Sequence, residues 1–272
     1  MTELCFVADM NHGNPVNFAR LAAASFGDIK CVGIIHKASQ GRGYTDPKYA
    51  QRRPDAIAAG FLWGAYAFNT GDDVKAQVTE FLEHACPEAE TGLYLDFEDN
   101  SASEMTLGQA VEFLDRVEQI MGRYCRMYSG NRLKEQIVHA TPAQVAYLAA
   151  YQDRLWGCEY GPLFKDVDAK GHRLPWPKPF LWQDTGDGLG PQPHTLDGIE
   201  NGADLSIFEG TRAELAAIWA GAALPPAVVA GPQPQAPARV DQALAPPPHK
   251  LTLVERLEEG VKETIEHVLG ES

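Results

Sequence analysis

Several common features are scarce in this chain, and each shortage excludes a class of protein. Five scattered cysteines, an odd number with no C-x-x-C pair, suit reduced, buried thiols rather than a disulfide framework or a zinc site. Basic residues are also few: 23 Lys and Arg face 37 Asp and Glu, a net charge of −14. That balance argues against nucleic acid or an anionic membrane surface as the main partner.

Metal and cofactor motifs are missing as well. His12, His36, His172 and His194 do not fall at ligand spacing, and no H-E-x-x-H run occurs. Gly41-Arg42-Gly43 lacks the third glycine of a dinucleotide-binding loop. We therefore expect no catalytic metal and no cofactor.

Long hydrophobic runs are absent too. The most apolar late stretch, Leu215–Ala230, is interrupted by Pro225 and Pro226, so no integral membrane segment is expected. The first residues, Met1–Leu4, show no basic region leading into an apolar one. We expect a protein made in the cytoplasm without a signal peptide.

The composition that is present predicts one large folded domain and a short tail. A chain of 272 residues with 44% hydrophobic content can bury a full core. We place the domain at residues 1–222 and a Pro/Ala-rich linker at 223–249. Residues 250–272 carry apolar positions at helical spacing, which predicts an amphipathic tail helix that binds a partner or self-associates.

Within the domain, strand-like runs alternate with helix-like ones, which favours a mainly parallel sheet. About eight strands in this length predict an α/β fold of the TIM-like β/α barrel type, with some helices short or missing. An open doubly wound sheet is the alternative. The predicted strands are Leu4–Asp9, Cys31–Lys37, Phe61–Phe68, Gly92–Phe97, Cys125–Ser129, Val145–Tyr151, Pro179–Gln183 and Asp204–Phe208. The predicted helices are Asn17–Ser25, Pro47–Ala59, Asp72–Ala85, Leu107–Met121 and Gly130–Val138.

The most informative run is Gly92–Asp99, an apolar strand that ends in acids. Asp96 and Glu98 stand at i and i+2, so they project from one face. Two carboxyl groups at a strand end suit acid/base chemistry on a glycosidic bond. Further acids and aromatic or polar side chains fall at the other predicted strand ends, where a barrel gathers its catalytic groups. They are Asp9, Lys37, Tyr66, Tyr128, Tyr151, Trp182, Gln183 and Asp204.

In this order the motifs resemble glycoside hydrolase family 25, the N-acetylmuramidase type of lysozyme. The matching pieces are Ala8–His12, Ile35–Gly41, Tyr44–Asp46, Gly64–Phe68, Leu95–Glu98, Met127–Ser129, Leu181–Gln183 and Ala203–Phe208. Two departures are Asn11, where the family usually has Ser, and Ala67, where it commonly has His. Ala67 and the irregular stretch Trp156–Pro179 put the family's substrate preference in question more than its chemistry.

The resemblance implies a role for each acid. Glu98 would be the general acid/base, and Asp96 either the nucleophile or the group that orients the substrate's 2-acetamido group. Asp9 and Asp204 would be flanking acids that shape the pocket. The stereochemistry is left open, because the spacing alone decides neither retention nor inversion.

Other side chains would bind the glycan. Tyr66, Tyr128 and Trp182 are proposed as sugar-contacting rings, and Gln183 as a hydrogen-bonding partner. Lys37 would hold a muramyl lactate carboxylate or pair with an inward Asp, and we favour the ion pair.

The expected function is a peptidoglycan hydrolase that cuts the β-1,4 bond between N-acetylmuramic acid and N-acetylglucosamine. With no signal peptide expected, it would be a phage endolysin or a delivered lytic effector that reaches the cell wall or periplasm after release. Two alternatives stay open: a non-catalytic barrel that binds glycan or a protein partner, and a relative acting on another acetamido glycan such as chitin.

Overall fold

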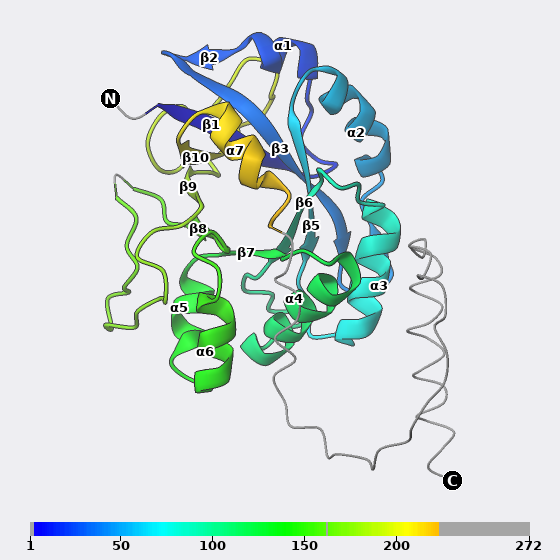
Figure 1. Ribbon diagram of the computed structural model, residues 1–272. Helices are drawn as coiled ribbons and strands as arrows, with labels where there is room; N and C mark the ends of the chain where they lie inside the picture. The colour runs from blue at the N-terminus through cyan, green and yellow to red at the C-terminus, as the bar shows by residue number, and fades with distance from the viewer. Residues whose placement is uncertain (1–2, 162, 223–272) are drawn as a thin grey trace, which may run out of the picture. The chain divides into compact units, whose positions relative to one another are not determined.

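A computed structural model describes residues 3–161 and 163–222 of the chain (Figure 1). The predicted linker at 223–249 and the predicted tail helix at 250–272 lie outside these residues. Among the residues that are described, no helix is both long and apolar enough to span a membrane.

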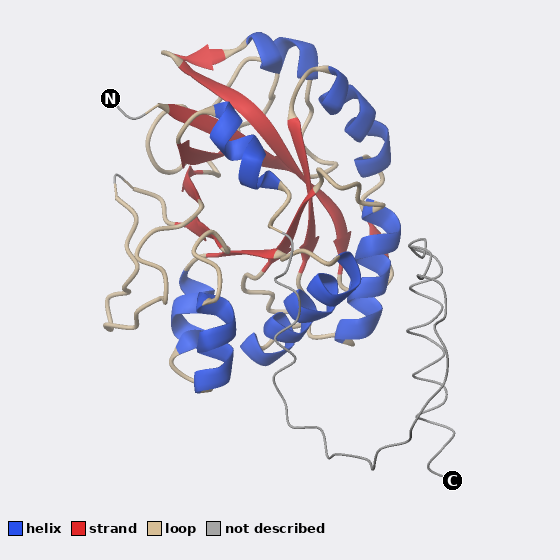
Figure 2. Cartoon of the chain, in the orientation of Figure 1, coloured by secondary structure: helices blue, strands red, loops and turns tan. Residues whose placement is uncertain are grey.

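The described residues form a closed eight-stranded barrel, as predicted (Figure 2). Its strands, in chain order, are β1 (Leu4–Met10), β3 (Ile29–Gln40), β5 (Leu62–Phe68), β6 (Gly92–Asp96), β7 (Arg126–Ser129), β8 (Leu155–Cys158), β9 (Leu181–Thr185) and β10 (Asp204–Glu209). The strands from β1 to β9 pair in parallel, whereas β10 runs antiparallel to both β9 and β1 and closes the barrel. Two short strands, β2 (Ser25–Phe26) and β4 (Tyr44–Thr45), pair with β3 alone.

Helices lie outside this sheet and bury their apolar faces against it (Figure 2). They are α1 (Phe18–Ala23), α2 (Tyr49–Ala58), α3 (Val74–Ala85), α4 (Leu107–Met121), α5 (Asn131–Ile137) and α6 (Pro142–Ala149). The helix α7 (Arg212–Trp219) instead packs Leu215 and Trp219 against residues of the barrel interior. The described parts of the connections from β8 to β9 and from β9 to β10 contain no helix. This agrees with the prediction that some helices are missing.

One predicted strand is wrong. The Val145–Tyr151 run lies mostly in α6, and the sixth barrel strand is β8, a few residues later. The run forms a helix because Thr141 caps it. The Thr141 side chain accepts from the backbone N–H of Gln144, and the Gln144 side chain accepts from the backbone N–H of Thr141. Tyr151 follows the helix and stacks on Tyr124, with ring centroids 4.4 Å apart, instead of standing at a strand end.

The end of the barrel away from the strands' carboxyl ends is filled by the last described helix. Trp219 of α7 is buried inside, and its indole nitrogen donates to the carbonyl oxygen of Trp63 at 2.8 Å. Gly33, Gly64 and Gly92 face it from three adjacent strands, and a Cβ on any of them would lie 3.1–3.2 Å from the indole. Glycine at these inward positions therefore makes room for Trp219. We call this end the floor and the opposite end the mouth.

Candidate active site

The mouth gathers acids from strands that are far apart in sequence. Asp9, near the end of β1, and Asp204, the first residue of β10, are register partners. They meet because β10 is antiparallel, so that its first residue lies where the other strands end. Asp96 ends β6 with its side chain on the inward face, and Glu98 follows two residues later. The charges of Asp204, Asp96, Glu98 and also Asp187 all act on Asp9. The structure thus brings the four predicted acids together.

Burial in this group favours the neutral form of each predicted acid. Burial raises the pKa of Asp96 well above its usual range, and the charge of Glu98 raises it further, opposed by Lys37. The pKa of Asp9 is also raised well above its usual range, first by burial and then by Asp204. Burial likewise raises the pKa values of Glu98 and Asp204. Such a cluster holds protons at a pH where exposed carboxyls have lost them.

The backbone at Glu98 is held by a residue that the sequence analysis missed. Asn69, fully buried after β5, donates its side-chain N–H to the carbonyl oxygen of Glu98 at 3.1 Å. Its backbone N–H donates to the carbonyl oxygen of Asp96 at the same distance. Phe97, the first residue after β6, donates its N–H to the carbonyl oxygen of Tyr128 at 2.8 Å. These bonds fix the direction in which the chain leaves β6.

Two of the predicted sugar-binding residues touch each other. The Tyr128 hydroxyl donates to the side-chain oxygen of Gln183 and also bonds the Glu98 side chain. The bond with Tyr128 partly offsets the rise in the pKa of Glu98. Tyr128 rests on Trp156, with ring centroids 4.4 Å apart. Tyr66 lies close enough for the charges of Asp96 and Asp9 to act on it, although burial is the main cause of its raised pKa.

Trp182 is not brought to this group. Its neighbours along β9, Leu181 and Gln183, face the barrel interior. Successive side chains of a strand point to opposite faces, so the Trp182 side chain points to the outer face. Its indole N–H donates to the carbonyl oxygen of Glu159 at 2.8 Å.

Lys37 faces the mouth, but the ion pair that we favoured is not formed among the described residues. Its ammonium donates instead to the side-chain oxygen of Gln40 at 2.5 Å and lies 4.6 Å from the centre of the Phe68 ring. The reason is local, since β3 continues to Gln40 and leaves that amide within reach. Burial lowers the pKa of Lys37, and the charge of Asp96 opposes this effect.

The end of β8 and the long connections around β9 supply three further groups that sequence reasoning missed. Asp187 has a positive φ of 53°, and its backbone N–H donates to Asp204 Oδ1 at 3.1 Å. A Cβ on Gly186 would lie 2.6 Å from the Tyr160 hydroxyl and 2.9 Å from Asp204 Oδ1, so Tyr160 also converges here. Cys158 hydrogen-bonds Tyr128 and Tyr160, and burial raises its pKa to about 11. The positions of Asp187 and Tyr160 depend on loop paths that no sequence pattern predicts.

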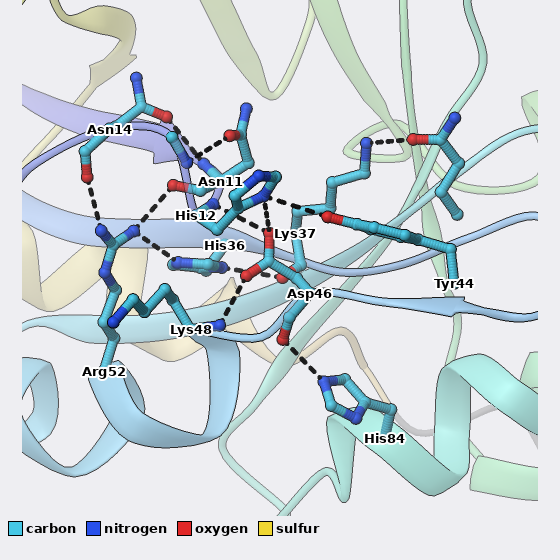
Figure 3. Close-up of polar contacts among 12 residues, drawn as sticks. Asn11, His12, Asn14, His36, Lys37, Tyr44, Asp46, Lys48, Arg52 and His84 are labelled. Atoms are coloured by element: carbon cyan, nitrogen blue, oxygen red, sulfur yellow. Dashed lines mark hydrogen bonds and ion pairs between the residues drawn. The ribbon is translucent and has the colours of Figure 1, made fainter.

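A buried polar network fixes the loop that follows β1 (Figure 3). Arg52 donates to the carbonyl oxygens of Asn11 and Asn14 at 2.7 and 2.6 Å. It also donates to His36 Nε2 at 3.0 Å, which leaves His36 Nδ1 to donate to the carbonyl oxygen of Lys37 at 2.8 Å. Burial lowers the pKa of His36 to about 4, so the ring stays neutral in this role.

Asp46 ties the same loop to β4. Burial opposes its ionisation, but backbone N–H groups of Lys48 and His12 donate to it at 2.9 Å each, and the pKa of Asp46 is lowered.

Among the residues that the structure describes, no group of three or more His, Cys, Asp and Glu side chains is arranged to hold a metal ion.

Glycoside hydrolases cut their bond with paired carboxyl groups, and the mouth of this closed β/α barrel presents buried carboxyl groups. The comparison with protein families gives the particular class. Residues 10–187 match the model of glycosyl hydrolases family 25, and the chain belongs to that family. The match includes Asp96 and Glu98, whereas Asp9 and Asp204 lie outside its ends.

Solved structures share the fold at low sequence identity. A bacterial lysozyme from Streptomyces coelicolor is 20% identical with a TM-score of 0.63, covering 80% of this chain and 98% of its own. A muramidase from Trichobolus zukalii is 22% identical with a TM-score of 0.62, covering 79% and 98%. The catalytic domain of endolysin ply40 from Listeria monocytogenes bacteriophage P40 is 17% identical with a TM-score of 0.56, covering 82% and 98%. No curated protein sequence matches the chain.

Proposed function

We propose that this protein is a peptidoglycan hydrolase of the muramidase type. Its reaction would be hydrolysis of the β-1,4 bond between N-acetylmuramic acid and N-acetylglucosamine. The observation that carries the proposal is the pairing of Asp96 and Glu98 at the mouth, both with raised pKa values, inside the matched part of the family. Solved structures of the same fold that are described as lysozyme, muramidase and endolysin support the substrate class.

In the proposed reaction Glu98 is the general acid. Its raised pKa keeps a proton available for the leaving oxygen, and the resulting carboxylate then takes a proton from the water that attacks the anomeric carbon. The water supplies the hydroxyl at the new reducing end, and its proton restores Glu98.

Asp96 acts on the sugar side of the bond. It serves either as nucleophile or as the group that orients the 2-acetamido group for attack on its own anomeric carbon. Asp9 and Asp204 shape the pocket and bind sugar hydroxyls, and Gln183 joins them through its bond with Tyr128. Tyr66 and Tyr128 offer rings to the glycan, whereas the outward direction of Trp182 leaves it a weaker candidate.

We further propose that the protein acts on the bacterial cell wall or in the periplasm, as a phage endolysin or a delivered lytic effector. The likeness to a bacteriophage endolysin domain supports this setting.

The test compares the wild type with Glu98→Gln on purified peptidoglycan, identifying new reducing ends by mass spectrometry. We expect muramic-acid reducing ends from the wild type and a loss of activity of at least about a hundredfold in the variant. Glu112→Gln is the matched control, because Glu112 is an exposed acid on α4 paired with Arg116 at 2.8 Å.

Two results would count against the proposal. Glucosamine reducing ends would identify a different bond. A wild type that binds several wall preparations without releasing fragments would be a glycan-binding module instead.

A further inference from the structure

A groove opens around Lys37, beside the proposed catalytic acids of the mouth. It encloses about 440 Å³, and its lining includes His12, Lys37, Gln40, Arg42, Tyr44 and Asp72. Lys37 links it to the proposed site, because the charge of Asp96 acts on Lys37. The Phe68 ring beneath the Lys37 ammonium is also the register partner of Asp96. A ligand bound at Asp96 can therefore extend directly into this groove.

The groove concentrates positive charge in a strongly acidic chain. Lys37 and Arg42 line it together, although Asp and Glu outnumber Lys and Arg by 37 to 23 overall. The one acid among the residues named above, Asp72, accepts a hydrogen bond from Thr70 Oγ1 at 2.6 Å.

An exposed ring completes the groove. Tyr44 is 37% exposed, and its hydroxyl lies 3.0 Å from His12 Nδ1 (Figure 3). Its ring centre is 5.8 Å from the Lys37 ammonium. Among the described residues neither Lys37 nor Arg42 forms an ion pair, whereas His12 Nδ1 lies 3.1 Å from Asp46 Oδ2.

Charge decides what this groove suits. A neutral acetamido glycan has no need of two cations, whereas a ligand with carboxylates approaching the acids of the mouth would be repelled without them. The muramyl branch carries carboxylates in either of two forms: the lactyl carboxylate where no peptide is attached, or the carboxylates of the peptide stem where the lactyl carboxyl is joined to it as an amide. A lactyl group has only three carbons, and a groove of 440 Å³ is the size of a small-molecule pocket.

We infer that this groove receives the carboxylate-bearing peptide stem of a muramyl residue bound at the acids. The inference rests on the proposed function and adds to it a basis for choosing peptidoglycan over a neutral acetamido glycan. Arg42 and Lys37 bind the stem's carboxylates, and the Tyr44 ring supports its backbone and methyl groups.

The experiment measures binding, so that it does not depend on turnover. The Glu98→Gln protein is titrated with a glucosaminyl-muramyl disaccharide carrying a tetrapeptide, and separately with the same disaccharide without peptide, whose lactyl carboxylate is free. We expect the peptide-bearing form to bind about tenfold more tightly. Adding Arg42→Glu should remove this difference, while Arg116→Glu, at an exposed cation on α4, should leave it. Arg42→Gln, which adds no new charge, serves if the charge reversal harms folding.

Equal affinity for the two disaccharides would overturn the inference. So would an equal loss for both in Arg42→Glu, because that would mean that Arg42 acts on the part the two ligands share and not on the stem. The proposed function is judged separately from hydrolysis by the wild type. If the wild type cleaves peptidoglycan but the two disaccharides bind equally, the proposed muramidase function stands and the inference that the groove binds the stem is rejected.

Discussion

Glu98 lies beyond the last residue of β6, so its position depends on side chains from neighbouring segments. Asn69 bonds its carbonyl oxygen, and the Tyr128 hydroxyl bonds its carboxyl group. An acid that transfers a proton needs its position fixed to a fraction of an ångström. We therefore regard Asn69 as a positioning residue for the proposed general acid.

Replacing Asn69 by alanine should reduce turnover more than binding. The change removes a buried hydrogen bond to the Glu98 backbone, so we expect kcat to fall by about ten- to a hundredfold with KM little changed. Steady-state kinetics on soluble peptidoglycan fragments would measure both constants. A proportional rise in KM with constant kcat would show that Asn69 serves only binding, and a melting curve would exclude global unfolding.

Asp187 offers a test of what sets the pKa of Glu98. After burial, its charge is the first cause that raises that pKa. Asp187→Asn keeps the backbone N–H bond to Asp204, and asparagine tolerates the positive φ at this position. The general acid works in its protonated form, so a lower pKa should move the alkaline limb of kcat/KM to lower pH.

The matched control is Asp197→Asn. Asp197 is an exposed acid in the connection between β9 and β10, and its partner is Arg20. An alkaline limb that shifts equally in both variants, or in neither, would contradict a direct effect of Asp187 on Glu98.

The α7 helix closes the floor through a single large side chain. Trp219→Ala would leave a cavity against Gly33, Gly64 and Gly92, and we expect it to lower the free energy of unfolding by about 3–5 kcal/mol. Urea unfolding followed by circular dichroism would measure the loss. Ile218→Ala, at the exposed preceding residue of the same helix, should cost far less. Similar losses in the two variants would mean that Trp219 does not fill the floor.

Elements with a strong local signal were predictable from the sequence, and the wrong strand came from missing such a signal. The runs at Leu4–Asp9, Phe61–Phe68 and Leu107–Met121 correspond closely to β1, β5 and α4. The error at Val145–Tyr151 came from reading apolar composition and overlooking the cap at Thr141 and Gln144, a signal present in the sequence.

For the site, the sequence indicated Asp9, Asp96, Glu98 and Asp204, because strand-end acids in a barrel meet at one end. It could not indicate that β10 is reversed, which is why Asp204 begins its strand where Asp9 ends one. Nor could it indicate Asn69 or Asp187, since their contacts depend on the paths of loops.

The acids at the mouth should also make the whole molecule less stable at neutral pH. A carboxyl whose folded pKa is raised contributes stability below its unfolded pKa of about 3.9, and that contribution is lost as pH rises through the folded pKa. Because the pKa of Asp96 is raised, Asp96→Asn should increase Tm at pH 7, and the gain should shrink towards pH 4. Differential scanning calorimetry at both pH values tests this.

Asp46 provides a control of opposite sign. Its pKa is lowered by backbone hydrogen bonds, so its contribution is present above the unfolded pKa and is lost as pH falls. Asp46→Asn should therefore decrease Tm at pH 7. If Asp96→Asn also decreased Tm at pH 7, the ionised Asp96 carboxylate would not be destabilising the folded protein, contrary to the prediction.

The antiparallel pairing of β1 with β10 has a consequence for the order of folding. This seam joins the two ends of the domain sequence: Leu4 pairs with Glu209, and Cys5 Sγ donates to the carbonyl oxygen of Gly210, 205 positions away. Contacts so distant in sequence carry a large loop-closure entropy, so we expect them to form after the local strand–helix units. Asp9 and Asp204 lie on the two sides of the seam. A nascent chain that stops before β10 therefore carries Asp96 and Glu98 without a completed pocket, so the enzyme acquires its site only in the final step of assembly.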